Sequence, residues 1–113
     1  MNEHGLTAEQ IRTIATILSP YADRIETVAL FGSRAQGTYR PDSDIDMVLY
    51  GSVGAHEIAR LHTLFDDSSL PFPVDIKAYQ LIDYGPLKDH IDRVAVPLLR
   101  QRDLTEDGFN VQA

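Results

Sequence analysis

Apolar side chains recur along the chain at two different spacings, and these spacings predict alternating helices and strands. Over Leu6–Ser19 they return every three or four positions, which places them on one face of an amphipathic helix. Thr7 and Gln10 stand three residues apart at its start, which is the spacing of a capping box. Pro20 follows and cannot continue a regular helix, so the first helix is expected to end there.

Short runs rich in β-branched and aromatic residues predict strands instead. Thr27–Phe31 is short and apolar and leads directly into a Gly-Ser turn signal. Asp44–Tyr50 and Val74–Tyr79 alternate between polar and apolar residues, as strands with one buried face do. Val96–Leu99 is expected to be extended, because a proline at its second position excludes a continuing helix.

The remaining periodic segments complete the predicted fold. Ala55–Asp67 and Gly85–Ala95 are expected to be helices, and Arg34–Gln36 a short helical turn. The order α-β-β-α-β-α predicts a small α/β (α+β) domain with one sheet over residues 6–99. Residues 100–113 are mostly polar, and we expect this tail to be frayed or ordered only by a partner.

Composition narrows the class of protein. The chain has 113 residues, enough for one domain with one core, and 43% of them are apolar. Its formal net charge is −7, which argues against direct binding to a nucleic-acid backbone. The absence of cysteine excludes disulfides and thiolate metal sites. Because no apolar run approaches a membrane span and the N-terminus has no signal-peptide pattern, we expect a cytoplasmic protein with no membrane contact.

A turn at Gly32 and Ser33 opens the segment that holds the candidate chemistry. A predicted strand ends there and a short helical turn begins. Backbone N–H groups at such a start favour an anion, and a glycine lets a phosphate approach closely. The Ser33 hydroxyl can donate a further hydrogen bond to that phosphate. Taken alone, however, the pair is more typical of an ordinary turn.

Three aspartates are predicted to come together beside this turn. Asp44 and Asp46 stand two apart on a strand, so their side chains leave the same face. Repulsion between them would raise the pKa of one carboxyl group, and Mg²⁺ would relieve it. Asp75 joins them if its strand is a neighbour, although a single strand aspartate is often only a surface residue. The set predicts a two-metal site for phosphoryl or nucleotidyl transfer.

These residues resemble a known signature. Gly-Ser, Arg-Ala-x-Gly and Arg-Pro-x-Ser-Asp-x-Asp follow one another over residues 32–46, and Val-Asp-Ile follows at 74–76. In this order they resemble the polymerase-beta-like nucleotidyltransferase superfamily and, more narrowly, its minimal nucleotidyltransferase (MNT) family. By topology the resemblance covers about residues 6–99. It implies the nucleotidyltransferase fold, in which helices flank a small mixed sheet.

The resemblance implies nucleotide-binding roles for two residues and catalytic, metal-binding roles for three. Gly32 and Ser33 would hold the β- and γ-phosphates of a nucleoside triphosphate, with ATP as the expected donor. Asp44 and Asp46 would ligate the nucleotide-bound Mg²⁺ and share a second Mg²⁺. Asp75 would complete the second site and help to activate the attacking hydroxyl group.

Other motif residues have less defined roles. Arg34 and Arg40 lie where a cation could contact the triphosphate or brace the loop, and both are candidate nucleotide-binding residues. Ser43 is expected to orient the loop. Tyr39 and Tyr50 flank the motif and are expected to pack against the protein rather than stack on a base.

The resemblance also implies a partner. MNT proteins are typically paired with a small helical HEPN protein, often an RNase toxin, and some transfer AMP from ATP to a tyrosine of that partner. We therefore expect an Mg²⁺-dependent nucleotidyltransferase that acts as an antitoxin. A non-catalytic subunit that binds nucleotide or masks its partner is the main alternative. Transfer to a small molecule ranks last, since antibiotic nucleotidyltransferases generally carry an additional helical domain.

Overall fold

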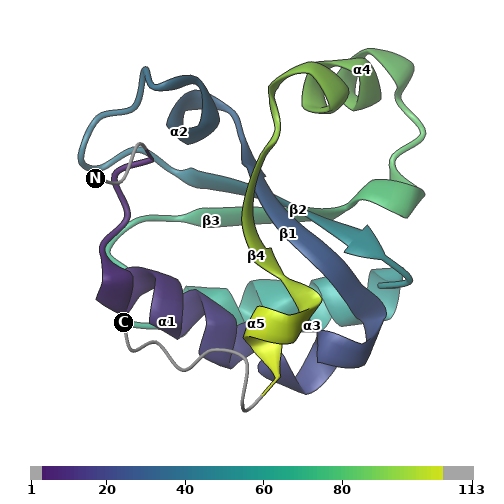
Figure 1. Cartoon of the computed structure of the whole chain (residues 1–113), viewed down its shortest axis with the longest axis horizontal. Coiled ribbons are helices and arrows are strands. Elements are labelled where there is room, and N and C mark those ends of the chain that lie inside the picture. The colour runs from purple at the N-terminus through teal and green to yellow at the C-terminus, as the bar shows by residue number, and fades with distance from the viewer. Residues whose placement is uncertain (1–3, 106–113) are drawn as a thin grey trace.

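A four-stranded mixed sheet forms the centre of the computed structural model, which describes residues 4–105 (Figure 1). The strand order is β3-β2-β1-β4. β1 is antiparallel to both β2 and β4, whereas β2 and β3 are parallel. The single sheet predicted from the sequence is therefore confirmed. The strands are β1 (Ile25–Phe31), β2 (Ile45–Gly51), β3 (Val74–Ala78) and β4 (Val96–Arg100).

Helices cover both faces of this sheet. In Figure 1, α1, α3 and α5 lie below the sheet and α2 and α4 lie above it. None of the helices within residues 4–105 has the length and apolar character needed to cross a membrane. The α-helices are α1 (Ala8–Leu18), α2 (Ser33–Gln36), α3 (Ala55–Asp66), α4 (Gly85–Val94) and α5 (Gln101–Leu104), and the 3-10 helices are η1 (Ser19–Arg24) and η2 (Tyr79–Leu81).

The start of α1 follows the predicted capping box. The backbone N–H of Gln10 donates to Oγ1 of Thr7 over 3.0 Å, and the N–H of Thr7 donates to Oε1 of Gln10 over 3.0 Å. The helix ends at Leu18, and Pro20 lies in the following 3-10 helix η1. The next strand, β1, begins at Ile25, two residues earlier than the β-branched pattern predicts, and Ile25 is fully buried.

Alternation along β2 separates the core from the candidate site. Ile45, Met47 and Leu49 are buried in the main core, on the face of the sheet covered by α1 and α3. Val48 lies on the opposite face, in a smaller core with Ile91 of α4. Asp46 shares this second face, as the period of two in a strand requires.

The first residues of the predicted tail are ordered in the structure. β4 extends to Arg100, and a short helix follows in which Leu104 is 2% exposed and belongs to the main core. The Arg100 N–H donates to Oδ2 of Asp103 over 2.8 Å, which caps this helix. The expectation of a frayed tail is therefore wrong for residues 100–104. Residues 106–113 of the predicted tail lie outside the described residues.

Candidate active site

The turn between β1 and α2 brings a glycine against a carboxylate. Gly32 has φ of +78° and ψ of −155°, a conformation that is essentially restricted to glycine. A Cβ atom built on Gly32 would overlap Oδ2 of Asp46 and lie 3.1 Å from its Cγ. Two physical requirements, backbone conformation and space, therefore select glycine at this position. The Asp46 carboxylate therefore packs directly against the backbone of this turn.

Strand register places the second and third aspartates side by side. Asp46 pairs with Asp75 across the parallel β2–β3 ladder and with Phe31 across the antiparallel β1–β2 ladder. Asp44 lies directly before the first residue of β2 and is exposed. The sequence-based expectation that the strands of Asp46 and Asp75 are neighbours is therefore confirmed.

The three carboxylates act on one another electrostatically. Partial burial raises the pKa of Asp46 above its ordinary value, and the charges of Asp75 and Asp44 raise it further. Lys77 opposes this shift, because its ammonium group favours the ionised form. Nζ of Lys77 lies 3.5 Å from Oδ2 of Asp75. Negative charge is therefore concentrated at the site. Lys77, which lies on β3 with Asp75, offsets only part of this charge.

The aspartates do not form a complete metal-binding site by themselves. Among residues 4–105, no group of three or more histidine, aspartate and glutamate side chains is arranged to hold a metal ion. Asp46 and Asp75 are both partly buried, whereas Asp44 stays open to solvent. A cation at this place would therefore take further ligands from water or from a bound substrate, which is common for Mg²⁺.

Arg34 corrects one expectation about nucleotide binding. Its side chain is only 1% exposed, and burial lowers the pKa of its guanidinium group. The guanidinium donates to the carbonyl oxygens of His4, Pro41 and Ser43. Of the two roles that the motif allows, the structure thus supports bracing the loop. It offers no exposed guanidinium face for a triphosphate.

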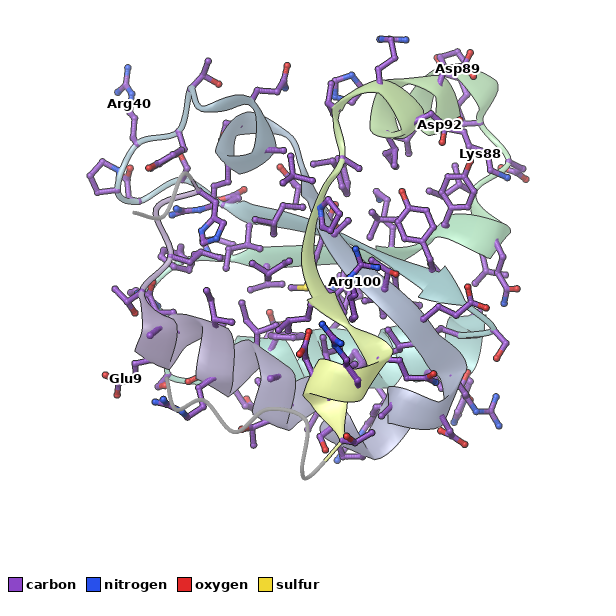
Figure 2. All side chains as sticks on the ribbon, viewed as in Figure 1. Glu9, Arg40, Lys88, Asp89, Asp92 and Arg100 are labelled. Atoms are coloured by element: carbon purple, nitrogen blue, oxygen red, sulfur yellow. The ribbon has the colours of Figure 1, made fainter. Side chains whose placement is uncertain are left out.

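The loop before β2 is held by its own side chains. Oγ of Ser43 accepts a hydrogen bond from the Arg40 N–H over 2.7 Å, which supports the expected loop-orienting role of Ser43. The Arg40 side chain is exposed and extends from the loop into solvent (Figure 2). No contact between the Arg40 side chain and the three aspartates is found in residues 4–105. Its contact with a nucleotide therefore stays a prediction.

Helix α4 borders the same face of the sheet and is tied to it by Tyr79. The Tyr79 hydroxyl donates to Oδ1 of Asp92 over 2.7 Å, and the Tyr79 ring lies 4.8 Å from that of Tyr50 and 4.7 Å from Nζ of Lys88. Figure 2 shows Lys88 and Asp92 on α4 at this side of the molecule. The packing role expected for Tyr50 is confirmed. The Tyr79–Asp92 pair was not predicted, because the two residues belong to separate elements with no shared motif.

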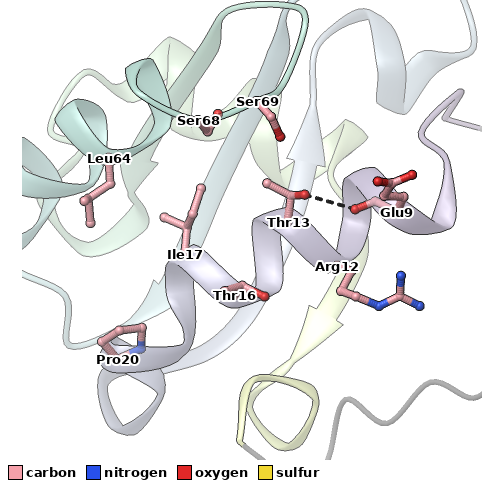
Figure 3. Close-up of a pocket in the computed structure, with 9 residues that line it drawn as sticks. All are labelled: Glu9, Arg12, Thr13, Thr16, Ile17, Pro20, Leu64, Ser68 and Ser69. Carbon is pink, nitrogen blue, oxygen red and sulfur yellow. Dashed lines mark hydrogen bonds between the residues drawn. The ribbon is translucent and has the colours of Figure 1, made fainter.

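A pocket of about 620 Å³ lies away from these carboxylates. It opens between α1 and the C-terminal end of α3, with Ile17 and Leu64 among its lining residues (Figure 3). These helices cover the other face of the sheet. None of the predicted site residues lines this pocket, so it is separate from the candidate active site.

A protein-family profile matches most of this chain. The profile of the family described as "Polymerase beta, Nucleotidyltransferase" matches residues 12–103, most of the chain. A candidate protein adenylyltransferase of Methanocaldococcus jannaschii is 40% identical over 53 residues, which are 47% of this chain and 50% of that protein. This chain therefore matches about half the length of that relative.

Solved structures share the fold. A toxin–antitoxin structure with AMP-PNP has a TM-score of 0.65 and 22% identity, over 80% of this chain and 73% of that one. The toxin–antitoxin complex MntA–HpeT, with two aspartates two residues apart replaced by glutamate, has a TM-score of 0.63 and 18% identity over 80% and 72% of the two chains. A candidate nucleotidyltransferase from Sulfolobus solfataricus has a TM-score of 0.50 and 18% identity, over 81% of each chain.

The comparisons and the site agree on one assignment. The family profile covers the Gly-Ser turn, the neighbouring Asp46 and Asp75, and Asp44 just before β2. The fold is also that of the MntA structures, as the resemblance to minimal nucleotidyltransferases implies. The chain belongs to the polymerase beta nucleotidyltransferase family.

Proposed function

We propose that this chain is an Mg²⁺-dependent nucleotidyltransferase that moves AMP from ATP to a tyrosine hydroxyl of a HEPN-type toxin, and thereby acts as its antitoxin. The single observation that carries the proposal is the placement of Asp46, which lies against Gly32 and in register with Asp75. One carboxylate is thereby shared between a glycine turn that can admit phosphate and a neighbouring acidic strand. This arrangement suits transfer of a phosphate-linked group.

The donor set fits Mg²⁺. Carboxylate oxygens are preferred ligands of this hard cation, which commonly combines one or two carboxylates with substrate phosphates. The raised pKa of Asp46 means that its ionised form is disfavoured until a positive charge is supplied. Asp44, Asp46 and Asp75 would hold the ions. Bound Mg²⁺ would polarise the phosphates and stabilise the negative charge on the leaving pyrophosphate.

The chain's own residues have distinct tasks in this reaction. The backbone N–H groups of the turn at Gly32 and Ser33 would hold the β- and γ-phosphates, and the Ser33 hydroxyl is available to donate a hydrogen bond to them. The tyrosine oxygen attacks the α-phosphorus, the bond to the β-phosphate oxygen breaks, and pyrophosphate leaves. A carboxylate oxygen of Asp75 accepts the proton of the attacking hydroxyl. The register of Asp46 with Asp75 and the glycine turn before α2 support these proposed roles.

The relatives support the class of reaction and of partner. The Methanocaldococcus jannaschii relative is named as a candidate protein adenylyltransferase, and two structural neighbours come from toxin–antitoxin complexes, one with AMP-PNP. An ATP-dependent antitoxin would work in the cytoplasm, where ATP and Mg²⁺ are available. The HEPN identity of the toxin and its tyrosine acceptor are part of our proposal.

The test is to co-express the chain with the proposed HEPN-type partner, sought first in the adjacent reading frame, and to measure the intact mass of that partner. We expect the mass of one AMP group on a tyrosine with the wild-type chain, and none with the Asp44→Asn/Asp46→Asn double variant. Asp66→Asn, an exposed aspartate at the end of α3, is the matched control and should act as the wild type does. An unmodified partner in the presence of the wild-type chain would reject the proposal.

The alternative function is a masking subunit that neutralises its partner without chemistry. The high negative charge of the chain is the feature that favours it, since an acidic surface can occupy a toxin's RNA-binding site. The double variant separates the two functions. If it protects cells from the toxin as well as the wild type does, the masking function is correct and the enzymatic one is not required.

A further inference from the structure

Arg34 is a buried charged side chain whose hydrogen bonds, among those found in residues 4–105, all go to backbone carbonyl groups, while the charge of the Asp42 carboxylate also favours its ionised form. Its relative exposure is 1%, yet neither ion pair in this part of the chain involves it. A buried cation is costly unless its donors are satisfied. Arg34 meets this requirement with backbone carbonyl groups, and the identity of those carbonyls indicates its function.

The guanidinium group holds the segment that leads into Asp44. Nε and Nη2 of Arg34 both donate to the carbonyl oxygen of Ser43, over 3.2 Å and 2.9 Å, and Nη2 also reaches the Pro41 oxygen over 3.3 Å. Ser43 directly precedes Asp44 in the chain. Nη1 donates to the His4 oxygen over 2.9 Å. The planar fork therefore fixes the backbone from which the first aspartate projects.

The same guanidinium group also contacts two aromatic rings. Its Cζ atom lies 5.2 Å from the ring centre of Tyr39 and 4.6 Å from that of Phe72. Phe72 belongs to the link that enters β3, three residues before Asp75. The next residue of this link, Pro73, accepts a hydrogen bond from the Ile45 N–H at the start of β2 over 2.9 Å. Arg34 thus contacts the chain just before both acidic strands.

The arginine itself lies in α2, two residues after Gly32. One buried group therefore connects the Gly-Ser turn, the segment before Asp44 and the link before Asp75. We propose that Arg34 is a positioning residue that sets the first and third aspartates relative to the phosphate-binding turn. This inference rests on the proposed function for its catalytic consequence, but not for its structural part. Lysine cannot replace it, because an ammonium group lacks the planar fork that reaches several carbonyls at once.

Hydrogen exchange of the full chain tests the structural part. The amides of Arg40, Ser43 and Ile45 report on it, since each donates a hydrogen bond in this region. In Arg34→Lys we expect these amides to exchange at least tenfold faster, after correction for the change at core amides of β1. Leu104→Ala, which weakens the core at α5, is the control for general destabilisation. It should change the three amides no more than those of β1.

A milder variant covers the case in which Arg34→Lys does not fold. Phe72→Leu removes one ring from the guanidinium and keeps an apolar side chain. Faster exchange at Arg40 and Ser43 is expected, because these amides are connected to Phe72 through Arg34. Unchanged corrected exchange in Arg34→Lys would overturn the inference, and so would unchanged exchange in Phe72→Leu if Arg34→Lys does not fold. An equal corrected effect in Leu104→Ala would overturn it as well.

Binding of Mg²⁺ with a non-hydrolysable ATP analogue, measured by calorimetry, tests the functional consequence. Arg34→Lys should bind at least tenfold more weakly than the wild type, while Leu104→Ala stays within about twofold. Equal affinity of Arg34→Lys and wild type would overturn the functional part. If the wild type itself binds no nucleotide, the proposed function fails and the exchange measurement still decides whether Arg34 positions the two segments.

Discussion

The carboxyl group of Asp46 occupies the space in which a side chain of residue 32 would stand, and it can do so because Gly32 has none. This relationship joins two parts of the site that come from different strands. A side chain added at residue 32 must therefore displace the Asp46 carboxyl group.

Gly32→Ala should impair the site more than the fold. The φ of +78° makes alanine strained by about 1–3 kcal/mol, and its Cβ would displace the Asp46 carboxylate. We expect a lower melting temperature and at least tenfold weaker binding of Mg²⁺ with an ATP analogue, measured by thermal unfolding and calorimetry.

Gly37→Ala provides the matched control for this variant. Gly37 also has a positive φ, +79°, but a Cβ built there meets no atom within 4 Å. It should lose about 1–2 kcal/mol of stability and keep its affinity for nucleotide. Equal loss of binding in the two alanine variants would show that strain, rather than the position of Asp46, is responsible.

Asp46→Asn should stabilise the metal-free protein at neutral pH. The pKa of Asp46 is raised in the folded state above its ordinary value of 3.8, so folding disfavours the ionised carboxylate. The stability of the wild type therefore falls as pH rises from about 3.8 through the folded-state pKa. Above that pKa the full penalty is present, and asparagine does not carry it.

Thermal unfolding in a chelator checks this prediction. The advantage of Asp46→Asn should be present at pH 7 and shrink as the pH approaches 4. Addition of Mg²⁺ and an ATP analogue should raise the melting temperature of the wild type and leave that of the variant unchanged. A variant that is less stable than the wild type at every pH would contradict the assigned electrostatics.

Lys77→Met should strengthen Mg²⁺ binding. Lys77 lies 3.5 Å from Asp75 and lowers the pKa of Asp46, so it competes with a metal ion for the same negative charge. Its removal should lower the Kd for Mg²⁺ by about two- to fivefold, since an exposed charge pair is worth about 0–1 kcal/mol. Lys88→Met, which removes the cation above Tyr79, is the control. If both variants change the Kd for Mg²⁺ equally, the effect comes from the net charge of the protein and not from the position of Lys77.

Leu104→Ala tests whether residues beyond 100 belong to the domain. Leu104 is 2% exposed in the main core, so truncation should cost about 2–5 kcal/mol of unfolding free energy. Leu81→Ala, at a residue that is 48% exposed, should cost less than about 1 kcal/mol. Denaturant unfolding measures both. If both variants lose less than about 1 kcal/mol, residues 100–104 do not contribute to the core and behave as a tail.

Local chemistry made much of this fold and site predictable. The capping box at Thr7, the alternation along the strand of Asp46 and the glycine turn each depend on residues that are close in sequence. The strands of Asp46 and Asp75 are neighbours, as expected from the sequence, and the structure adds that they pair in parallel, as one helical crossover between them allows.

The remaining features depend on contacts between distant segments. Arg34 is buried because carbonyls of residues 4, 41 and 43 surround it, and backbone acceptors leave no pattern in a sequence. Leu104 stands in a polar stretch, and only the packing of α5 against β1, η1 and α1 makes it a core residue. The Tyr79–Asp92 hydrogen bond likewise requires α4 to lie over the sheet.

The most direct measurement of the central claim compares ATP labelled on the α-phosphate with ATP labelled on the γ-phosphate, each incubated with Mg²⁺, the chain and the proposed HEPN-type partner. A nucleotidyltransferase built on Asp44, Asp46 and Asp75 transfers the α-label to the partner and releases the γ-label as pyrophosphate. The transfer should require Mg²⁺ and disappear in the Asp44→Asn/Asp46→Asn variant. Transfer of the γ-label, or α-label transfer that persists in this variant, would contradict the account.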